Sequence, residues 1–149
     1  MMTQDVRVAE ILLVEDNEGD IELTREAFGD AIFRNNLHIA EDGDIALDYL
    51  YKRNGYETAV LPDIILLDLN LPSTDGKEVL QIVKSDPLLR KIPVIVLTSS
   101  EADKDVMESY DLHANWYIVK PVNASKFMKV VKDVEKFWSD IVCLPSSHR

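Results

Sequence analysis

Five short apolar runs, separated by segments with helical spacing, constrain the fold of this chain more than any other feature. The runs predict strands at Glu10–Val14, Leu37–Ala40, Asp63–Asp68, Pro93–Thr98 and Trp116–Val119. The segments between and after them predict helices at Asp20–Ile32, Asp44–Arg53, Asp75 through Val83, Ala102–Tyr110 and Ala124–Trp138. Continuous apolar strands alternating with helices are typical of a parallel sheet covered on both faces. The sequence therefore predicts an α/β fold with a doubly wound, five-stranded parallel sheet.

The composition fits one domain with an ordinary core. The chain has 149 residues, of which 46% are hydrophobic and 29% charged. No apolar run has the length of a membrane span, and the first residues lack the layout of a signal peptide. Cys143 is the single cysteine in the sequence, which excludes an internal disulfide and fits a reducing compartment. These features predict a cytoplasmic protein without a membrane segment.

The charge balance bears on the kind of partner. With 27 acidic and 16 basic residues, the formal net charge is −11. This charge disfavours long-range attraction to nucleic acids and anionic lipids. A cation, or a protein with a basic patch, is the expected partner.

Polar side chains follow four of the five predicted strands. They are Glu15 and Asp16 after the first, Asp68 and Asn70 at the third, Thr98 at the fourth and Lys120 after the fifth. Each of these is unremarkable alone, because polar residues commonly end strands. Right-handed crossovers, however, bring the carboxyl ends of parallel strands to one edge of the sheet, where such folds bind ligands. The set therefore predicts one shared site at that edge.

The residue types of this set suggest phosphoryl chemistry. Three neighbouring carboxylates repel one another, and a hard divalent cation such as Mg²⁺ relieves the repulsion while keeping several waters and phosphate oxygens as ligands. An ammonium group such as that of Lys120 suits a phosphoryl oxygen, and a carboxylate can itself accept a phosphoryl group. The sequence thus predicts that Asp68 carries a phosphoryl group balanced by Mg²⁺ and Lys120. For Asp68 alone, a solvated strand-end residue is the competing interpretation.

Four ordered motifs make the chain similar to the receiver domains of bacterial two-component response regulators. They are "ILLVEDNEGD", "PDIILLDLNLPSTDG", "IPVIVLTSS" and "WYIVKPV", which together span Ile11–Val122, and the helices extend the match to about Trp138. The resemblance implies a flavodoxin-like sheet with strand order 2-1-3-4-5. It also implies a switch that catalyses only its own phosphorylation and dephosphorylation, with Mg²⁺ or Mn²⁺ as cofactor.

The resemblance also implies a role for each matching site residue. Asp68 matches the phospho-acceptor and metal ligand, Asp16 the direct metal ligand, and Glu15 a residue acting on the metal through water. Asn70 lies where the family supplies a backbone carbonyl to the metal. Lys120 and Thr98 match the ammonium and the switch hydroxyl that contact the phosphoryl group. Tyr117, three residues before Lys120, matches the aromatic residue that rotates inward.

Longer stretches resemble a subgroup of this family. "VEDNEGDIELTREAF", "EDGDIALDYLY" and "SDPLLRKIPVIVLTSS" are similar to the small receivers that serve cyanobacterial phytochrome histidine kinases, the Rcp type. This resemblance implies a red/far-red light-sensing kinase as phosphodonor. The family often dimerises through its fourth helix, fifth strand and fifth helix, so a homodimer is expected. We expect residues 1–138 to form the receiver domain. Signalling is expected to proceed through protein contact, because no basic helix pair for DNA binding follows.

Residues 139–149 and Trp116 each admit two interpretations. The tail 139–149 continues the apolar character of the last helix, so it is either a frayed end or a segment that packs across a dimer interface. Trp116 either packs at the last strand or helps form an association surface.

Two other functions compete with the receiver interpretation. An aspartyl-phosphate phosphatase of haloacid-dehalogenase type would need a second Asp two residues after the nucleophile, and Asn70 stands there. A flavodoxin-like cofactor binder would place a phosphate at the first strand–helix turn, but the turn Glu15–Asp20 is acidic and would repel it. Treatment with acetyl phosphate and Mg²⁺ would separate the three functions.

Overall fold

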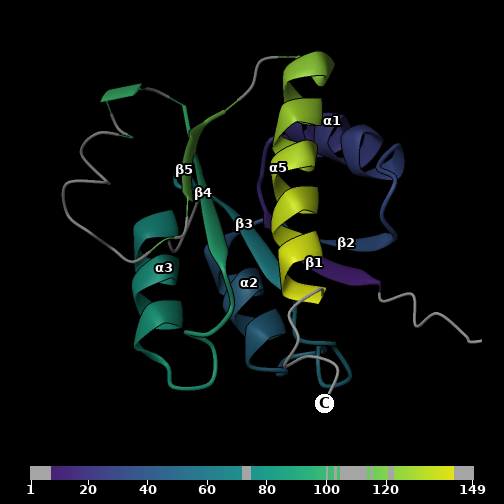
Figure 1. The fold of residues 1–149 in the computed structure, drawn as a ribbon. Helices are drawn as coiled ribbons and strands as arrows, with labels where there is room; N and C mark the ends of the chain where they lie inside the picture. Colours follow the sequence, from purple (N-terminus) through teal and green to yellow (C-terminus); the bar gives the residue numbers. More distant parts are fainter. Residues whose placement is uncertain are drawn as a thin grey trace, which may run out of the picture.

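The computed structural model describes residues 8–71, 75–99, 101–102, 104, 114, 116–120 and 123–142. Its elements, labelled as in Figure 1, are β1 Ala9–Val14, α1 Glu18–Gly29, β2 Asn35–Ala40, α2 Gly43–Leu50, β3 Ile64–Asp68, α3 Gly76–Ser85, β4 Val94–Thr98, β5 Trp116–Val119 and α5 Ala124–Val142. Most of the helix predicted at Ala102–Tyr110 lies outside the described residues.

The five strands form one parallel sheet in the order β2-β1-β3-β4-β5. In the register of the sheet, Val14 lies beside Ala40 and Leu67, and Asp68 lies beside Leu97. The carboxyl ends of the central strands therefore meet at one edge. The predicted fold class and strand order are confirmed.

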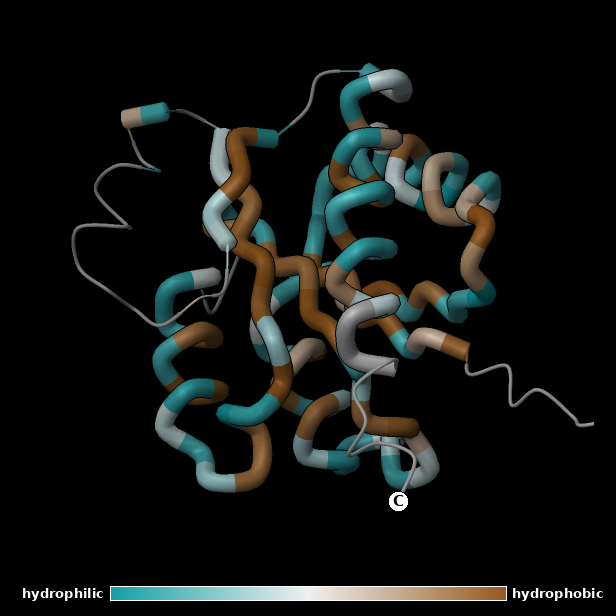
Figure 2. The backbone as a smooth tube through the Cα atoms, viewed as in Figure 1, coloured by the Kyte–Doolittle hydropathy of each residue, from teal (hydrophilic) through white to brown (hydrophobic). Residues whose placement is uncertain are grey.

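Helices cover both faces of the sheet, and two hydrophobic clusters fill the layers between (Figure 1). On one face, α1 and α5 pack on alternate strand residues that include Ile11, Leu13 and Leu66. On the other, α2 and α3 pack on the intervening residues, such as Leu12 and Leu67. Figure 2 shows the central strands as continuous hydrophobic segments, as burial on both faces requires.

Side-chain caps set where three helices begin. Asn17 accepts a hydrogen bond from the Asp20 backbone N–H, and Asp42 and Asp75 cap α2 and α3 in the same way. Such caps satisfy N–H groups that have no partner within the helix, and acidic residues in the first turn favour the helix dipole. Asp42 and Asp44 thus mark the start of α2.

Three predicted helix ends were wrong. The second helix was predicted to reach Arg53, but α2 ends at Leu50, with Tyr51 as its C-cap. The first helix was predicted to reach Ile32, but α1 ends at Gly29, and Ile32 lies in the following loop with 89% of its surface exposed. Ile32 continues the helical spacing by chance, because the chain has already left the helix at Asp30. The last helix was predicted to end at Trp138, but α5 continues to Val142, and Trp138 is buried in the core.

The exposure of Ile32 makes a stability prediction. Replacing Ile32 with Ala is expected to change the free energy of unfolding by less than about 0.5 kcal/mol, because the side chain buries almost no surface. Chemical denaturation of the two proteins measures this difference. A loss of about 2 kcal/mol or more would mean that Ile32 is packed in a core, as the helical spacing suggested.

None of the helices among the described residues combines the length and the apolar character needed to cross a membrane.

Candidate functional site

The alternation of side chains along the strands carries three charged residues to the same face of the sheet. Glu15 lies two residues after Leu13, and Asp68 two residues after Leu66, on the face covered by α1 and α5. Lys120 follows Ile118 in the same way at the end of β5. The sheet thus brings two carboxylates and one ammonium group together at its carboxyl edge, although more than a hundred residues separate Glu15 from Lys120.

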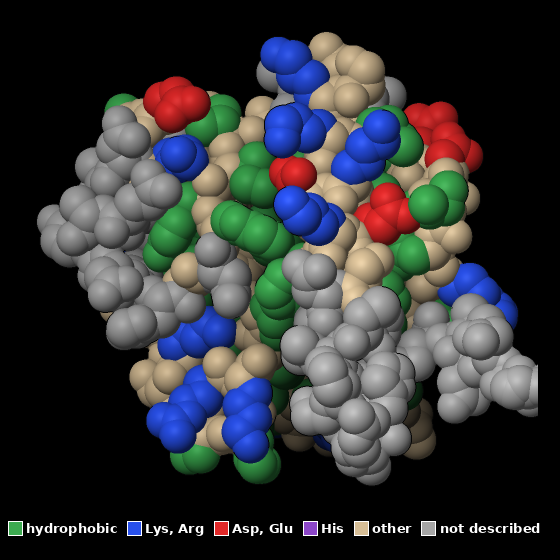
Figure 3. All heavy atoms as spheres, in the orientation of Figure 1, with side chains coloured by type: hydrophobic (Ala, Val, Ile, Leu, Met, Phe, Trp, Pro, Cys, Tyr) green, Lys and Arg blue, Asp and Glu red, His purple; other side chains and the backbone are tan. Residues whose placement is uncertain are grey.

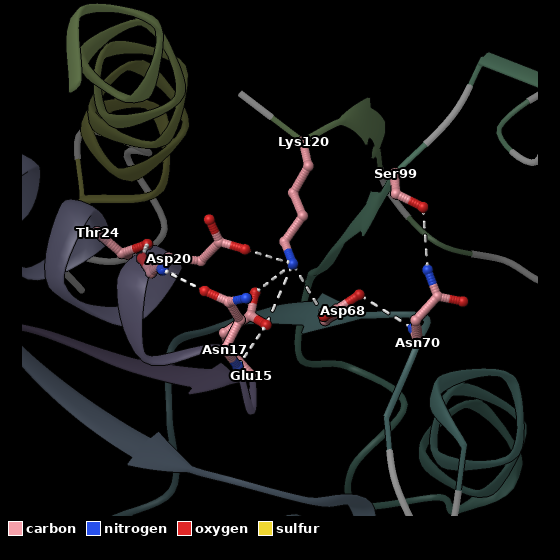
Figure 4. A network of polar contacts seen from close by, with 8 residues as sticks. All are labelled: Glu15, Asn17, Asp20, Thr24, Asp68, Asn70, Ser99 and Lys120. Atoms are coloured by element: carbon pink, nitrogen blue, oxygen red, sulfur yellow. Dashed lines mark hydrogen bonds and ion pairs between the residues drawn. The ribbon is translucent and has the colours of Figure 1, made fainter. Parts of the chain in front are cut away.

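The ammonium group of Lys120 is the centre of this cluster (Figure 4). Its Nζ lies 2.9 Å from Glu15 Oε1, 3.1 Å from Asp68 Oδ2 and 2.8 Å from Asp20 Oδ2. The side chain of Lys120 is 15% exposed. Burial alone would lower the pKa of Lys120, but hydrogen bonds with Asp20 and Glu15 and attraction to Asp68 raise it above its ordinary value. Lys120 therefore remains a cation.

The two strand-end carboxylates are almost fully buried. Glu15 is 1% and Asp68 2% exposed. Burial, together with the neighbouring Asp68 carboxylate, raises the pKa of Glu15 to about 7, even though Lys120 acts in the opposite direction. The positive charge of one ammonium group is therefore not enough to neutralise the carboxylates of this site.

The carboxylate arrangement fits a divalent cation. Glu15, Asp16 and Asp68 each present an oxygen, and these oxygens lie within 4.8 Å of one another. Asp16 is exposed, so a cation there could keep several waters, as Mg²⁺ and Mn²⁺ commonly do. The oxygen-only donor set and its excess negative charge support a hard divalent metal at this position.

Asn70 connects the end of β3 to the end of β4. Its backbone N–H donates a hydrogen bond of 3.0 Å to Asp68 Oδ1, and its side-chain Nδ2 donates to Ser99 Oγ at 3.2 Å (Figure 4). Together with Lys120, which contacts Oδ2, Asn70 fixes the orientation of the Asp68 carboxylate.

The predicted switch residues lie toward the opposite face of the sheet. Because side chains alternate along β4, Thr98 points to the same face as Val94 and Val96, which is the face covered by α2 and α3. Tyr117 packs against the hydrophobic cluster on that face. Thr98 is completely buried, and its hydroxyl has no hydrogen-bond partner within the described part of the chain. The Tyr117 hydroxyl is also buried. A buried hydroxyl without a partner is uncommon, and a ligand oxygen at this edge would satisfy that of Thr98.

Gly76, the first residue of α3, lies directly against the backbone of Asp68. Its N–H donates to the Leu69 carbonyl at 3.2 Å. A Cβ atom at this position would lie 2.4 Å from the Asp68 carbonyl oxygen and 2.6 Å from Leu69 Cα. A residue with a side chain would therefore force apart α3 and the strand end that carries Asp68.

The structure brings the predicted site residues to this edge except Tyr117, which lies beside Val96 within the sheet, and three contributors were given no role at the site. Asp20 was assigned only to a helix start, and Ser99 and Gly76 were given no role. Asp20 lies in the first turn of the helix that directly follows Glu15 and Asp16, and this closeness in sequence could have indicated its position. The close approach of Gly76 depends on the packing of α3, which no local pattern shows.

Comparisons with known proteins agree with this arrangement. The chain is 43% identical over 137 residues to response regulator Rcp1 of Synechocystis sp., which covers 92% of this chain and 93% of Rcp1. It is 41% identical to the probable methanogenesis regulatory protein FilR2 of Methanothrix harundinacea, over 86% of this chain and 82% of FilR2.

Two solved structures of response regulators also superpose on this chain. The phosphorylated cyanobacterial phytochrome response regulator RcpA superposes with a TM-score of 0.82 at 45% identity, covering 93% of this chain and 99% of RcpA. The Mn²⁺-bound form of Rcp1 superposes with a TM-score of 0.79 at 43% identity, covering 92% and 99%. The family described as the response regulator receiver domain matches residues 11–132. The chain therefore belongs to the response regulator receiver domain family.

Proposed function

We propose that the chain is a phosphorylation switch in which Asp68 is the phospho-acceptor. An Asp68 carboxylate oxygen attacks the phosphorus of a phosphohistidine, the P–N bond breaks, and the electron pair leaves with the histidine. Hydrolysis reverses the state when water attacks the phosphorus and the bond to Asp68 breaks. The observation that carries the proposal is the buried Asp68 carboxylate, held by Lys120 and the Asn70 N–H at the ligand-binding edge of the sheet.

We assign the metal site to Asp16 and Asp68 as direct ligands, with the Asn70 backbone carbonyl as a third ligand and Glu15 acting through water. When bound there, Mg²⁺ neutralises charge on the phosphoryl oxygens. Lys120 supplies the second positive charge. Because Asp16 is exposed and Glu15 buried, Asp16 is the acid that solvent-borne metal reaches first.

Metal binding is expected to stabilise the protein. Millimolar Mg²⁺ should raise the melting temperature relative to EDTA, because a ligand that binds only the folded state stabilises it by mass action. Replacing Asp16 with Asn should abolish most of this increase, whereas replacing the exposed Glu26 with Gln, an equal change of charge, should leave it intact. Thermal melting measures the shift. An equal Mg²⁺ response in the Asp16→Asn protein would remove Asp16 from the metal site.

Thr98 and Tyr117 form the switch in this proposal. Phosphorylation gives the buried Thr98 hydroxyl an oxygen acceptor, and the resulting shift at the end of β4 changes the packing of Tyr117 on β5. Such a shift alters the population of two existing states. The Lys120 backbone N–H, which donates to the Thr98 carbonyl, couples the two strand ends directly.

Acetyl phosphate tests this function. With Mg²⁺ the protein should gain one base-labile phosphoryl group and lose it slowly, and with EDTA it should gain none. This result would also support the view that the protein catalyses only its own phosphorylation and dephosphorylation. Rapid multiple turnover on phosphate esters would instead favour the haloacid-dehalogenase alternative, which the family match and the Asn70 contact with Ser99 do not support.

The phosphodonor in this proposal is a histidine kinase of the phytochrome type. RcpA is a phytochrome response regulator and matches this chain over nearly its full length. FilR2, a relative named for methanogenesis regulation, has a sequence identity to this chain close to that of RcpA, so identity alone does not select a phytochrome kinase as the phosphodonor. Phosphotransfer from light-switched phytochrome kinases, compared with kinases of other inputs, tests the assignment. Preference for a kinase without a chromophore would overturn it.

We propose further that the protein forms a homodimer through β5 and α5. The ring of Trp116 on β5 packs edge-on against Phe137 of α5, as the packing interpretation expected, and its 39% exposure leaves it accessible to the proposed association surface. The two rings border a groove of about 280 Å³ that Ile118, Asp133 and Lys136 also line. In Figure 3 hydrophobic side chains lie between Lys and Arg side chains on this face.

The C-terminal tail is a second part of the proposed dimer. We propose that the tail 139–149 contributes to this interface; its first residues belong to α5, which ends at Val142, and residues 143–149 lie outside the described residues. Analytical ultracentrifugation of the full chain and of a chain ending at Val142 tests this. A dimer unaffected by the truncation would remove the tail from the interface, and a monomeric full chain, both unphosphorylated and phosphorylated, would exclude the dimer.

A further inference from the structure

The ammonium group of Lys120 has no N–H donor left for a further ligand. It has three N–H groups. Three carboxylates contact it, those of Glu15, Asp20 and Asp68, at 2.8–3.1 Å (Figure 4). The contact with Asp20 is the shortest of these. A phosphoryl oxygen on Asp68 can therefore bind Lys120 only if one carboxylate gives up its hydrogen bond.

Asp20 differs from the other two carboxylates in where it is attached. Glu15 and Asp68 belong to the sheet edge, whereas Asp20 lies in the first turn of α1. Its backbone N–H donates to Asn17 Oδ1 at 2.9 Å, and its carbonyl accepts from Thr24 Oγ1 at 2.7 Å. These bonds fix the Asp20 backbone. Its side chain therefore contacts Lys120 from α1, whereas Glu15 and Asp68 contact it from the sheet edge.

From these contacts we infer that Asp20 is a positioning residue, one that competes with the phosphoryl group on Asp68 for the ammonium group of Lys120. The inference rests on the proposed function. It adds a restraint on phosphoryl binding, namely the contact by which Asp20 occupies Lys120. In the unphosphorylated protein Asp20 occupies one Lys120 donor, and in this inference its contact, rather than that of Glu15 or Asp68, is the one that the phosphoryl group replaces. Asp20 also adds a negative charge beside an incoming dianion, which weakens its binding further.

Beryllofluoride, an analogue of the phosphoryl group, measures the competition without turnover. In the presence of Mg²⁺, the Asp20→Asn protein should bind beryllofluoride about fivefold to tenfold more tightly than the wild type, because the substitution removes a charge-assisted competitor for Lys120 at a partly solvated site. The Asp20→Glu protein, which keeps the carboxylate, should remain within about twofold of the wild type.

A second substitution on the same helix separates this restraint from a general effect of charge. Glu22 is 70% exposed at its side chain and pairs with Arg25, so Glu22→Gln removes an equal charge without touching Lys120. It should change beryllofluoride affinity less than about twofold. Far-UV circular dichroism and thermal melting should show that all three variants are folded at the assay temperature.

Phosphorylation by acetyl phosphate supplies an independent measurement. The Asp20→Asn protein should show a lower KM for acetyl phosphate, with a smaller change in kcat, because the restraint acts on binding of the phosphoryl group. A purely structural role for Asp20 would lower the melting temperature without lowering KM.

The possible outcomes are distinct. If the wild type binds beryllofluoride and Asp68→Asn does not, the proposed function holds, and the Asp20 variants test the restraint alone. Equal or weaker binding by Asp20→Asn, or a gain matched by Glu22→Gln, overturns the restraint. If the wild type does not bind beryllofluoride with Mg²⁺, both the proposed function and the restraint fail.

Discussion

Replacing Lys120 with Met is expected to lower the free energy of unfolding by about 3 kcal/mol, measured by denaturation in EDTA. The side chains of Glu15 and Asp68 are 1% and 3% exposed, and Lys120 is their cation. Without it, two buried carboxylates face each other uncompensated. Removing one member of a buried charged cluster costs more than the cluster contributes, because the remaining charge stays desolvated. The variant should also accept phosphate from acetyl phosphate far more slowly than the wild type.

Lys129 provides a matched control for this substitution. It lies on α5, its side chain is 80% exposed, and its pairing with Asp133 is a surface contact at 3.4 Å. Lys129→Met should change stability by less than about 0.5 kcal/mol. A Lys120→Met protein as stable as Lys129→Met would contradict the view that Lys120 compensates a buried acidic cluster.

The second large effect concerns Gly76. Replacing it with Ala should lower the free energy of unfolding by about 3 kcal/mol, because the new Cβ atom overlaps backbone atoms that cannot rotate away. The distances are 2.4 Å to the Asp68 carbonyl oxygen and 2.6 Å to Leu69 Cα. Relief of this overlap must move either α3 or the end of β3. Denaturation measures the loss, and slower uptake of phosphate from acetyl phosphate should accompany it.

Gly29 tests whether the effect belongs to the site or to glycine as such. It is the last residue of α1, and a Cβ atom there would meet no other atom within 4 Å. Gly29→Ala should be neutral or stabilise by up to about 1 kcal/mol, because alanine reduces the freedom of the unfolded chain. A comparable loss at both positions would exclude the steric explanation for Gly76.

The fold could be predicted from the sequence because its strongest pattern has few solutions. Continuous apolar strands separated by amphipathic helices lead to a doubly wound sheet, and right-handed crossovers place the strand ends together. That logic also brought Glu15, Asp68 and Lys120 to one edge, where the structure places them in contact. The strand order itself rested on the family resemblance.

The wrong helix ends arose because the spacing of apolar residues does not stop where the helical backbone stops. Ile32 continues the helical spacing of α1 beyond the residue where the helix ends, and Trp138 was taken as a helix end although α5 continues past it. Periodicity reports which residues could share a face, but it does not show where the backbone leaves the helix.

Asp20 and Gly76 could not be assigned a role for a different reason. The contact of Asp20 with Lys120 joins residues a hundred positions apart, and the approach of Gly76 to Asp68 depends on how α3 meets the sheet. Both contacts belong to tertiary packing. Local patterns placed Asp20 at a helix start and Gly76 after a cap, which is correct for each but does not reveal the contact.

The central claim is that Asp68, buried beside Lys120 at the sheet edge, is the residue that carries the phosphoryl group. Mass-spectrometric mapping after treatment with acetyl phosphate and Mg²⁺ tests it most directly. We expect one modified peptide with the acyl phosphate on Asp68, and no modification in the Asp68→Asn protein. An acyl phosphate on another residue of the wild-type protein, or undiminished phosphorylation of Asp68→Asn, would mean that Asp68 is not the phospho-acceptor.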